Sequence, residues 1–154
     1  FTPWEPEKVI VGSWERAEQY LEAIIRDFKN WVAGWLDWNL ALDIKGGPNW
    51  AKFAADASII VNPSTDEFFK QPFYYAISHL SKFVPKGSVR IQMEGVQAPR
   101  KLGYMAFLRP DNATVVVFLN RLSYAAKISL LDEEMGTVFH QVPARSIQTL
   151  VYYS

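Results

Sequence analysis

The chain has 154 residues, of which 16 are basic and 16 acidic, so its formal net charge at neutral pH is zero. This balance offers no basic surface of the kind that binds nucleic acid, and the lack of cysteine excludes disulfides and thiol catalysis. His79 and His140 do not have the spacing of a metal-binding pair. A composition that is 49% hydrophobic and 15% aromatic indicates a globular protein.

The first predicted element is a helix that begins after Ser13. Ser13 is a favourable N-cap, and Glu15 in the first turn complements the helix dipole. Apolar residues recur at helical spacing from Trp14 to Val32, and Gly34 is expected to end the helix. This pattern predicts an amphipathic helix with one broad apolar face.

A short apolar run, residues 36–42, follows and ends abruptly in the Gly/Pro-rich loop 46–50, which is typical of a buried strand. The run contains Asp37 and Trp38, and the loop contains Asn49 and Trp50. Tryptophan faces offer contact area to the C–H surface of a sugar ring, and carboxylates accept hydrogen bonds from hydroxyls. Two interpretations stay open: a sugar-binding surface, or a strand whose tryptophans only fill a core.

A second helix is predicted from Pro72 to Val84, preceded by a possible capping box formed by Ser64 and Glu67. The pattern then changes to β-prone segments, and Asp111 with Asn112 is the best candidate for a hairpin turn. Six short strands at this spacing predict an antiparallel β-sandwich. They are expected at residues 89–93, 104–108, 115–119, 128–131, 138–140 and 147–153.

Four motifs in the chain resemble the C-terminal portion of the lysosomal glucosylceramidases, the acid β-glucosidases of glycoside hydrolase family 30. They are GSWERAEQY, GWLDWNLAL, GGPNW and KQPFYYAISHLSKFVPKGS, which start at residues 12, 34, 46 and 70. The resemblance implies an α/β part followed by an all-β part. Residues 1–87 are expected to form the last helix and strand elements of a (β/α)₈ TIM barrel, and residues 88–154 the flanking β-sandwich. The chain is therefore expected to be the C-terminal part of a longer enzyme.

The resemblance also implies an activity, the hydrolysis of glucosylceramide to glucose and ceramide by a retaining β-glucosidase. Retaining glycosidases use two carboxyl groups, and in this family both are glutamates that would precede Phe1, so the chain alone is expected to be inactive. No metal or organic cofactor is implied. The expected partners are a glycosphingolipid substrate at a membrane surface, the N-terminal remainder of the same enzyme and a lipid-presenting activator protein. The expected location is lysosomal or secreted.

Site residues follow from the same resemblance. Trp38 matches the tryptophan that lines the glucose subsite, and Asp37 beside it is interpreted as a substrate contact or, alternatively, as an ion pair or helix cap. Asn49 and Trp50 lie in the loop that borders the pocket, where turn chemistry and packing are the alternative. Ungapped alignment places Phe53 where the family typically has a substrate-contacting asparagine, whereas a one-residue shift would place it on the family phenylalanine that follows and delete the asparagine. Both alignments remove a polar contact, which predicts either a more apolar pocket or a different loop geometry.

Two further sites lie outside the predicted pocket. Trp4 and Glu5 match the mobile lid of the family, or are simply part of a chain terminus. Asn112-Ala113-Thr114 is an acceptable N-glycosylation sequon, whereas Asn62 is followed by proline.

Two rival functions stay open. In one, the β-sandwich is a non-catalytic module that binds carbohydrate or a protein. In the other, the fold is kept and the substrate is another β-glycoside, such as a xylan or a galactolipid.

Overall fold

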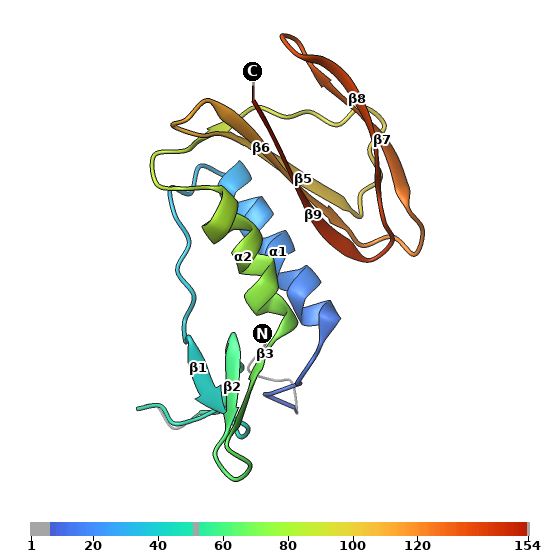
Figure 1. The fold of residues 1–154 in the computed structure, drawn as a ribbon. Coiled ribbons are helices and arrows are strands. Elements are labelled where there is room, and N and C mark those ends of the chain that lie inside the picture. The colour runs from blue at the N-terminus through green and yellow to red at the C-terminus, as the bar shows by residue number, and fades with distance from the viewer. Residues whose placement is uncertain (1–6, 51–52, 154) are drawn as a thin grey trace.

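A computed structural model describes residues 7–50 and 53–153 of the chain (Figure 1). Its two helices lie against one face of a four-stranded antiparallel sheet, and a two-stranded hairpin covers the opposite face. A small three-stranded sheet lies beyond one end of the helix pair. The elements are α1 (Trp14–Lys29), β1 (Ala41–Asp43), β2 (Ile59–Asn62), β3 (Glu67–Lys70), α2 (Pro72–Phe83), β4 (Val89–Ile91), β5 (Leu102–Leu108), β6 (Ala113–Asn120), β7 (Ala126–Asp132), β8 (Gly136–Val142) and β9 (Ser146–Tyr153).

Helix α1 begins as the sequence predicts but ends earlier. The Ser13 hydroxyl accepts a hydrogen bond from the Arg16 backbone N–H, which confirms the N-cap. The helix ends at Lys29, because Asn30 caps its last turn and Trp31 adopts a left-handed backbone with φ 68°. The prediction that the apolar helix face extends to Val32 is therefore wrong, and both Trp31 and Val32 are exposed.

The predicted strand over residues 36–42 is also mostly wrong. Only Ala41–Asp43 forms a strand, β1, and the segment before it runs from α1 to β1 without a strand partner among the described residues (Figure 1). A strand needs a neighbour to pair its backbone groups, and β1 finds one only where it lies parallel to β2. Leu36 consequently has 95% of its surface exposed.

The chain between β1 and α2 forms two strands that sequence analysis missed. Strand β2 pairs in parallel with β1 and antiparallel with β3, giving the order β1-β2-β3. The expected capping box is wrong, since Glu67 begins β3 and Ser64 lies in the preceding turn, where it bonds to Asn62. Helix α2 begins instead at Pro72, whose missing N–H is tolerated at the first helical position.

The six strands expected after residue 88 are all present and confirm the antiparallel β part of the fold. They form a sheet in the order β4-β5-β6-β9 and the separate hairpin β7-β8. Strand β6 is buried at all eight positions because the helices cover one of its faces and the hairpin covers the other. The predicted turn at Asp111 and Asn112 joins β5 to β6.

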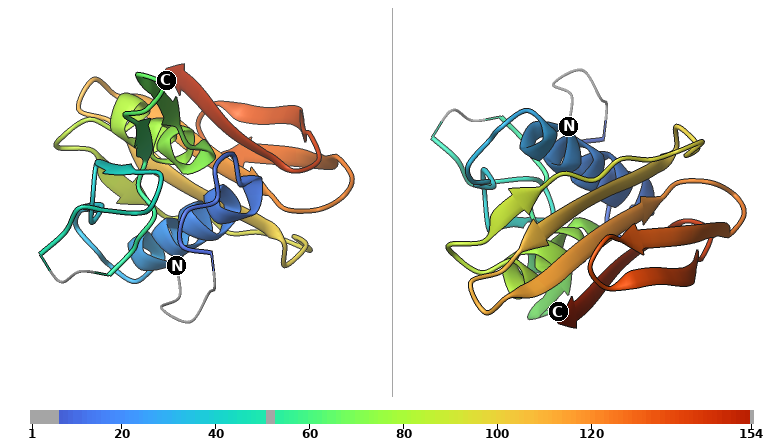
Figure 2. Two further views of the ribbon diagram at one scale, coloured as in Figure 1. Left: turned by 90° about the horizontal axis from the view of Figure 1, so that it is seen from below. Right: turned by 90° about the horizontal axis from the view of Figure 1, so that it is seen from above.

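The main hydrophobic core lies between the helices and the sheet. It includes Leu21 and Ile24 of α1, Phe73 of α2, and Val115 and Val117 of β6. Figure 2 shows from two further sides that both helices lie against the same sheet. One core therefore includes residues from both sides of the predicted boundary between residues 87 and 88.

Ion pairs and hydrogen bonds at the edge of this core connect the helices to β9 and to the loops that flank β6 and β9. Glu22 of α1 pairs with Arg121, and Glu18 of α1 accepts a hydrogen bond of 2.7 Å from Nε of Arg145. On α2, Nδ1 of His79 lies 2.8 Å from the Thr149 hydroxyl on β9. Among the described residues, no helix is both long and apolar enough to cross a membrane.

Candidate functional site

Asp37 is held in place by neighbouring groups of the same chain. Its Oδ2 accepts a hydrogen bond of 2.8 Å from the Ser58 hydroxyl, and its Oδ1 accepts one of 2.8 Å from the backbone N–H of Trp38. The Tyr20 hydroxyl on α1 also interacts with this carboxylate. Asp37 makes neither an ion pair nor a helix cap with any described residue, so those two alternatives are not what the structure shows.

Tyr20 and Trp35 anchor this segment to the core. Nε1 of Trp35 donates a hydrogen bond of 3.2 Å to the Tyr20 hydroxyl, and the two rings meet edge to face with centroids 5.8 Å apart. Phe73 of α2 packs against the same tyrosine at 5.4 Å. Burial, above all, raises the pKa of Tyr20 far above its ordinary value, and the Asp37 carboxylate contributes in the same direction. Tyr20 therefore stays protonated at every physiological pH.

Trp38 presents an aromatic surface next to this anchored carboxylate. Its side chain is 78% exposed, although its backbone N–H is held by Asp37. Asn39 follows, and its Nδ2 is buried without a hydrogen-bond partner in the described part of the chain. Buried polar atoms in folded proteins nearly always have partners. Two consecutive residues thus differ in kind: Trp38 has an exposed indole, and Asn39 has a buried amide donor without an acceptor in the described part of the chain.

The GGPNW loop is organised by Asp43, a residue that sequence analysis did not single out. Oδ1 of Asp43 accepts hydrogen bonds from the backbone N–H groups of Lys45 (2.7 Å) and Gly47 (3.0 Å). These two bonds, the one from Gly47 first, lower the pKa of Asp43 below its usual value. The signal was available, because Asp followed by a Gly pair is typical of a turn in which the carboxylate caps backbone N–H groups.

Gly46 is required by the shape of the same loop. It has φ +81°, and a Cβ there would lie 2.4 Å from the Ala55 carbonyl oxygen. The Gly47–Pro48 peptide bond is cis. The loop borders a shallow hollow of about 300 Å³ that is lined by Lys45, Gly46, Gly47, Pro48, Asn49, Phe53 and Ala54.

The Asn49 side chain makes both of its hydrogen bonds within the loop. Its Nδ2 donates to the Phe53 carbonyl oxygen, and its Oδ1 accepts a hydrogen bond of 3.2 Å from the Phe53 N–H. The alternative of turn chemistry is therefore the role that the structure shows for Asn49. Trp50 is fully exposed and so does not pack as a core residue, while the Phe53 side chain is half exposed at the hollow.

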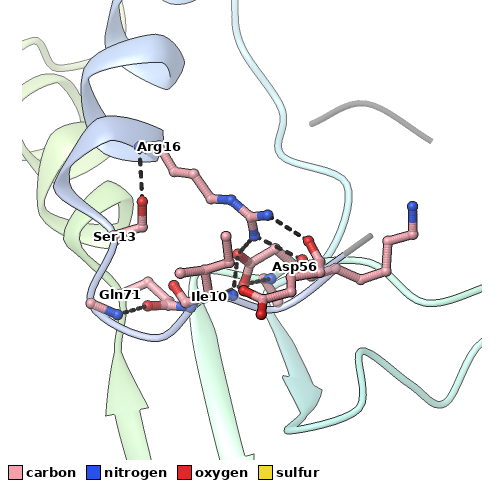
Figure 3. A network of polar contacts seen from close by, with 9 residues as sticks. Ile10, Ser13, Arg16, Asp56 and Gln71 are labelled. Atoms are coloured by element: carbon pink, nitrogen blue, oxygen red, sulfur yellow. Dashed lines mark hydrogen bonds and ion pairs between the residues drawn. The ribbon is translucent and has the colours of Figure 1, made fainter. Parts of the chain in front are cut away.

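A buried polar network lies in the segment just before Ser58, the residue that hydrogen-bonds to Asp37 (Figure 3). The Arg16 guanidinium of α1 pairs with Asp56, and the Gln71 amide donates to Asp56 Oδ1 at 3.0 Å. Arg16 also donates to the carbonyl oxygens of Lys8 and Glu7 at 2.7 and 2.8 Å. The network ties α1, the N-terminal segment and the start of α2 to the segment before β2, which contains Asp56 and Ser58.

The predicted site residues separate into two groups. Asp37 and Trp38 lie before β1, whereas Asn49 lies in the loop after it, and no described contact joins the two groups. Trp4 and Glu5 lie outside the described residues. In the described ranges, 7–50 and 53–153, no group of three or more His, Cys, Asp or Glu side chains has the arrangement of a metal site.

Comparison with known proteins identifies the family. Residues 3–84 match the glycosyl hydrolase family 30 TIM-barrel domain, and residues 87–150 match the β-sandwich domain of the same family. The chain therefore belongs to glycoside hydrolase family 30. Its fold class is that of the last TIM-barrel elements followed by the β-sandwich, as the sequence predicts.

The relatives include enzymes named as glucosylceramidases. The chain is 42% identical to lysosomal acid glucosylceramidase of Mus musculus over 149 residues, which is 97% of this chain and 28% of that protein. It is 40% identical to putative glucosylceramidase 4 of Caenorhabditis elegans, covering 92% of this chain and 28% of that one. The crystal structure of SrfJ from Salmonella typhimurium matches 99% of this chain and 33% of its own, with a TM-score of 0.86 and 27% identity. The chain thus spans between a quarter and a third of each relative.

Proposed function

We propose that the full-length protein is a retaining β-glucosidase that hydrolyses glucosylceramide to glucose and ceramide. In this proposal residues 1–87 supply the last elements of the catalytic barrel and residues 88–154 supply the flanking β-sandwich. Both catalytic glutamates come from the remainder of the enzyme, so the isolated chain is inactive. The 42% identity to a lysosomal acid glucosylceramidase supports this substrate.

The observation that carries the proposal is the pairing of an anchored Asp37 with an exposed Trp38. Ser58, just before β2, and Tyr20 of α1 hold the carboxylate from two separate parts of the chain, which fixes the backbone of the neighbouring Trp38. Together these two groups can bind one sugar ring. The carboxylate can accept hydrogen bonds from the sugar hydroxyls, and the indole face can contact the C–H groups of the ring. We assign these two residues to the wall of the glucose subsite.

The unpartnered amide of Asn39 supports a contribution from the remainder of the enzyme. Its buried Nδ2 has no acceptor in the described part of the chain, and Leu36 nearby is almost fully exposed. Completion of the barrel supplies both a neighbouring strand for this segment and an acceptor for the amide. The same segment also exposes Trp38 and Leu40, and grouped exposed apolar side chains mark interaction sites.

The second group of predicted site residues is assigned to the rim of the pocket. Trp50 projects from the GGPNW loop, and Asn49 shapes that loop rather than contacting substrate. Phe53 presents an aromatic side chain beside the hollow, which favours an apolar contact where the family has a polar one. Trp4 and Glu5 are assigned to the lid, with a glycosphingolipid at a membrane surface as the substrate. A lipid-presenting activator protein and a lysosomal location belong to the same proposal.

The rival function, an autonomous binding module formed by residues 88–154, is less well supported. The main core groups Val115 and Val117 of β6 in one buried cluster with Leu21 and Ile24 of α1. Removal of residues 1–87 would expose this apolar face of the sheet to water, at a cost of roughly 25 cal/mol per Å² of apolar surface. The sandwich and the two helices are therefore expected to unfold together.

The experiment is a comparison of two exposed tryptophans in the full-length enzyme. Trp38→Ala is expected to lower kcat/KM for glucosylceramide by about 10- to 100-fold, which corresponds to about 1–3 kcal/mol of lost contact. Trp31→Ala is the matched control, because Trp31 is similarly exposed but lies just after the C-cap of α1, where its ring contacts the Arg90 guanidinium. Equal effects of the two substitutions would contradict the assignment. Parallel assays with glucosyl, galactosyl and xylosyl lipids identify the preferred glycone.

A further inference from the structure

The tip of the β5–β6 hairpin carries an asparagine that no contact of the fold uses. The Asn112 N–H donates to the Arg109 carbonyl oxygen at 3.0 Å, and the Arg109 N–H donates to the Ala113 carbonyl oxygen at 2.8 Å. These two bonds close the turn, and Asn112 occupies its left-handed position with φ 63°. Asparagine is one of the few residues that tolerate this conformation. The backbone of Asn112 therefore has a structural role.

The side chain of Asn112 has no such role. It is exposed, and its amide makes no hydrogen bond to any residue in the described ranges. Its neighbours are occupied with each other, since both carboxylate oxygens of Asp111 accept hydrogen bonds from the Arg109 guanidinium at 3.0 and 2.6 Å. The turn is thus fixed without the Asn112 amide, which is free to carry a substituent into solvent.

Thr114, the third residue of the sequon, is buried, unlike Asn112. Thr114 is 8% exposed in β6, pairs with Tyr152 of β9, and shares a hydrogen bond with the Tyr152 hydroxyl. Ala113 between the two is completely buried. An enzyme that reads Asn-X-Thr in an extended segment cannot reach this threonine once the sheet has formed. Any modification of Asn112 must therefore precede folding, and the folded hairpin then presents the product at its tip.

A second asparagine provides an internal contrast. Asn62 is followed by Pro63 and Ser64, so it lacks an acceptable sequon. Its Oδ1 also accepts hydrogen bonds from the Ser64 hydroxyl (2.6 Å) and the Ser64 N–H (3.3 Å). Asn112 thus combines a sequon with an unengaged side chain, whereas Asn62 has neither feature.

From these observations we infer that Asn112 is an N-glycosylation site, modified on the unfolded chain before β6 pairs with β9. The donor is a polyisoprenyl-diphosphate oligosaccharide. The bond between its anomeric carbon and the diphosphate oxygen breaks, a bond between the same carbon and Asn112 Nδ2 forms, and the amide proton and the polyisoprenyl diphosphate leave. This inference rests on the secretory route that the proposed lysosomal location requires.

The position of the tip makes a glycan compatible with the proposed catalytic role. Ala113 pairs with Tyr153, so the tip lies beside the C-terminal end of β9. In Figure 1 that end lies at the top of the molecule, whereas β1, between the two groups of candidate site residues, lies at the bottom. A glycan on Asn112 is therefore remote from Trp38, and Asn112→Gln is expected to leave kcat/KM unchanged.

The test is peptide mapping of the full-length protein purified from a eukaryotic secretory host. Enzymatic removal of N-glycans in heavy-oxygen water converts a glycosylated asparagine to labelled aspartate. The expected result is label at residue 112 and none at residue 62. Asn112→Gln should remove the label, and Thr114→Ser should retain it, because serine keeps the sequon.

Pro63→Ala serves as the control for the secretory route, since it creates a sequon at Asn62. If Asn62 of this variant is labelled and Asn112 is not, the inference is overturned although the chain has passed through the glycosylation machinery. If neither residue is labelled, the inference is overturned together with the proposed location. Glucosylceramide hydrolysis measured on the same preparations shows separately whether the proposed activity stands.

Discussion

Replacement of Asp56 by alanine is expected to destabilise the protein strongly. The Arg16 and Asp56 side chains are 5% and 0% exposed, so the substitution removes the Asp56 carboxylate from a buried ion pair. Breaking a buried ion pair by removing one partner costs about 3–5 kcal/mol. Arg16 keeps the carbonyl oxygens of Lys8 and Glu7 as acceptors, which favours the lower end of that range. We therefore expect a loss of about 3 kcal/mol, equivalent to a Tm decrease on the order of 10 °C.

The matched control is the ion pair between Arg109 and Asp111, which has good geometry but is exposed to solvent. Exposed pairs contribute about 0–1 kcal/mol, so Asp111→Ala is expected to change Tm only slightly. Urea unfolding followed by tryptophan fluorescence measures both variants against the wild type. Asp56→Asn should fall between wild type and Asp56→Ala, because it keeps an acceptor for the Gln71 amide. If Asp56→Ala loses no more stability than Asp111→Ala, the account of the network is wrong.

Three other perturbations test separate parts of the structure. Burial lowers the pKa of His79, so the folded state resists its protonation, and stability should fall as pH drops through the unfolded value of about 6.5. His79→Gln, which retains a polar partner for Thr149, should flatten the dependence of Tm on pH between about 5 and 7; an unchanged slope would contradict this. Gly46→Ala forces a Cβ toward the Ala55 carbonyl oxygen at a left-handed position, and should cost at least about 1–3 kcal/mol in urea unfolding. Trp38→Phe in the full-length enzyme should retain more activity than Trp38→Ala, because a smaller aromatic face remains; equal losses would argue against ring contact.

The two long helices and the six C-terminal strands were predictable because their signals are local. The N-cap at Ser13 and the proline at position 72 mark helix starts, and alternating or β-branched residues mark the strands. Strands β2 and β3 were missed because they are only four residues long and β3 is exposed on both faces. Their stability depends on pairing with each other and with β1, which no local pattern reveals.

The candidate site was predictable only in part. Asp37 and Trp38 stood out as residue types, and the GGPNW motif located the loop. The partners that fix them come from distant positions: Ser58 is 21 residues from Asp37, and Trp35 is 15 residues from Tyr20. Side-chain contacts over such separations depend on tertiary packing. The secondary structure around Asp37 was mispredicted for a related reason, since residues 36–40 have strand-like composition but no partner strand in the described chain.

The configuration of the glucose that the full-length protein releases from glucosylceramide distinguishes a retaining from an inverting enzyme. Proton magnetic resonance follows the first turnovers, before the two anomers of glucose equilibrate. β-Glucose is expected to appear first, because a retaining enzyme preserves the configuration of the cleaved bond. Initial release of α-glucose, or no release of glucose, would contradict the assignment of this chain to a retaining glucosylceramidase.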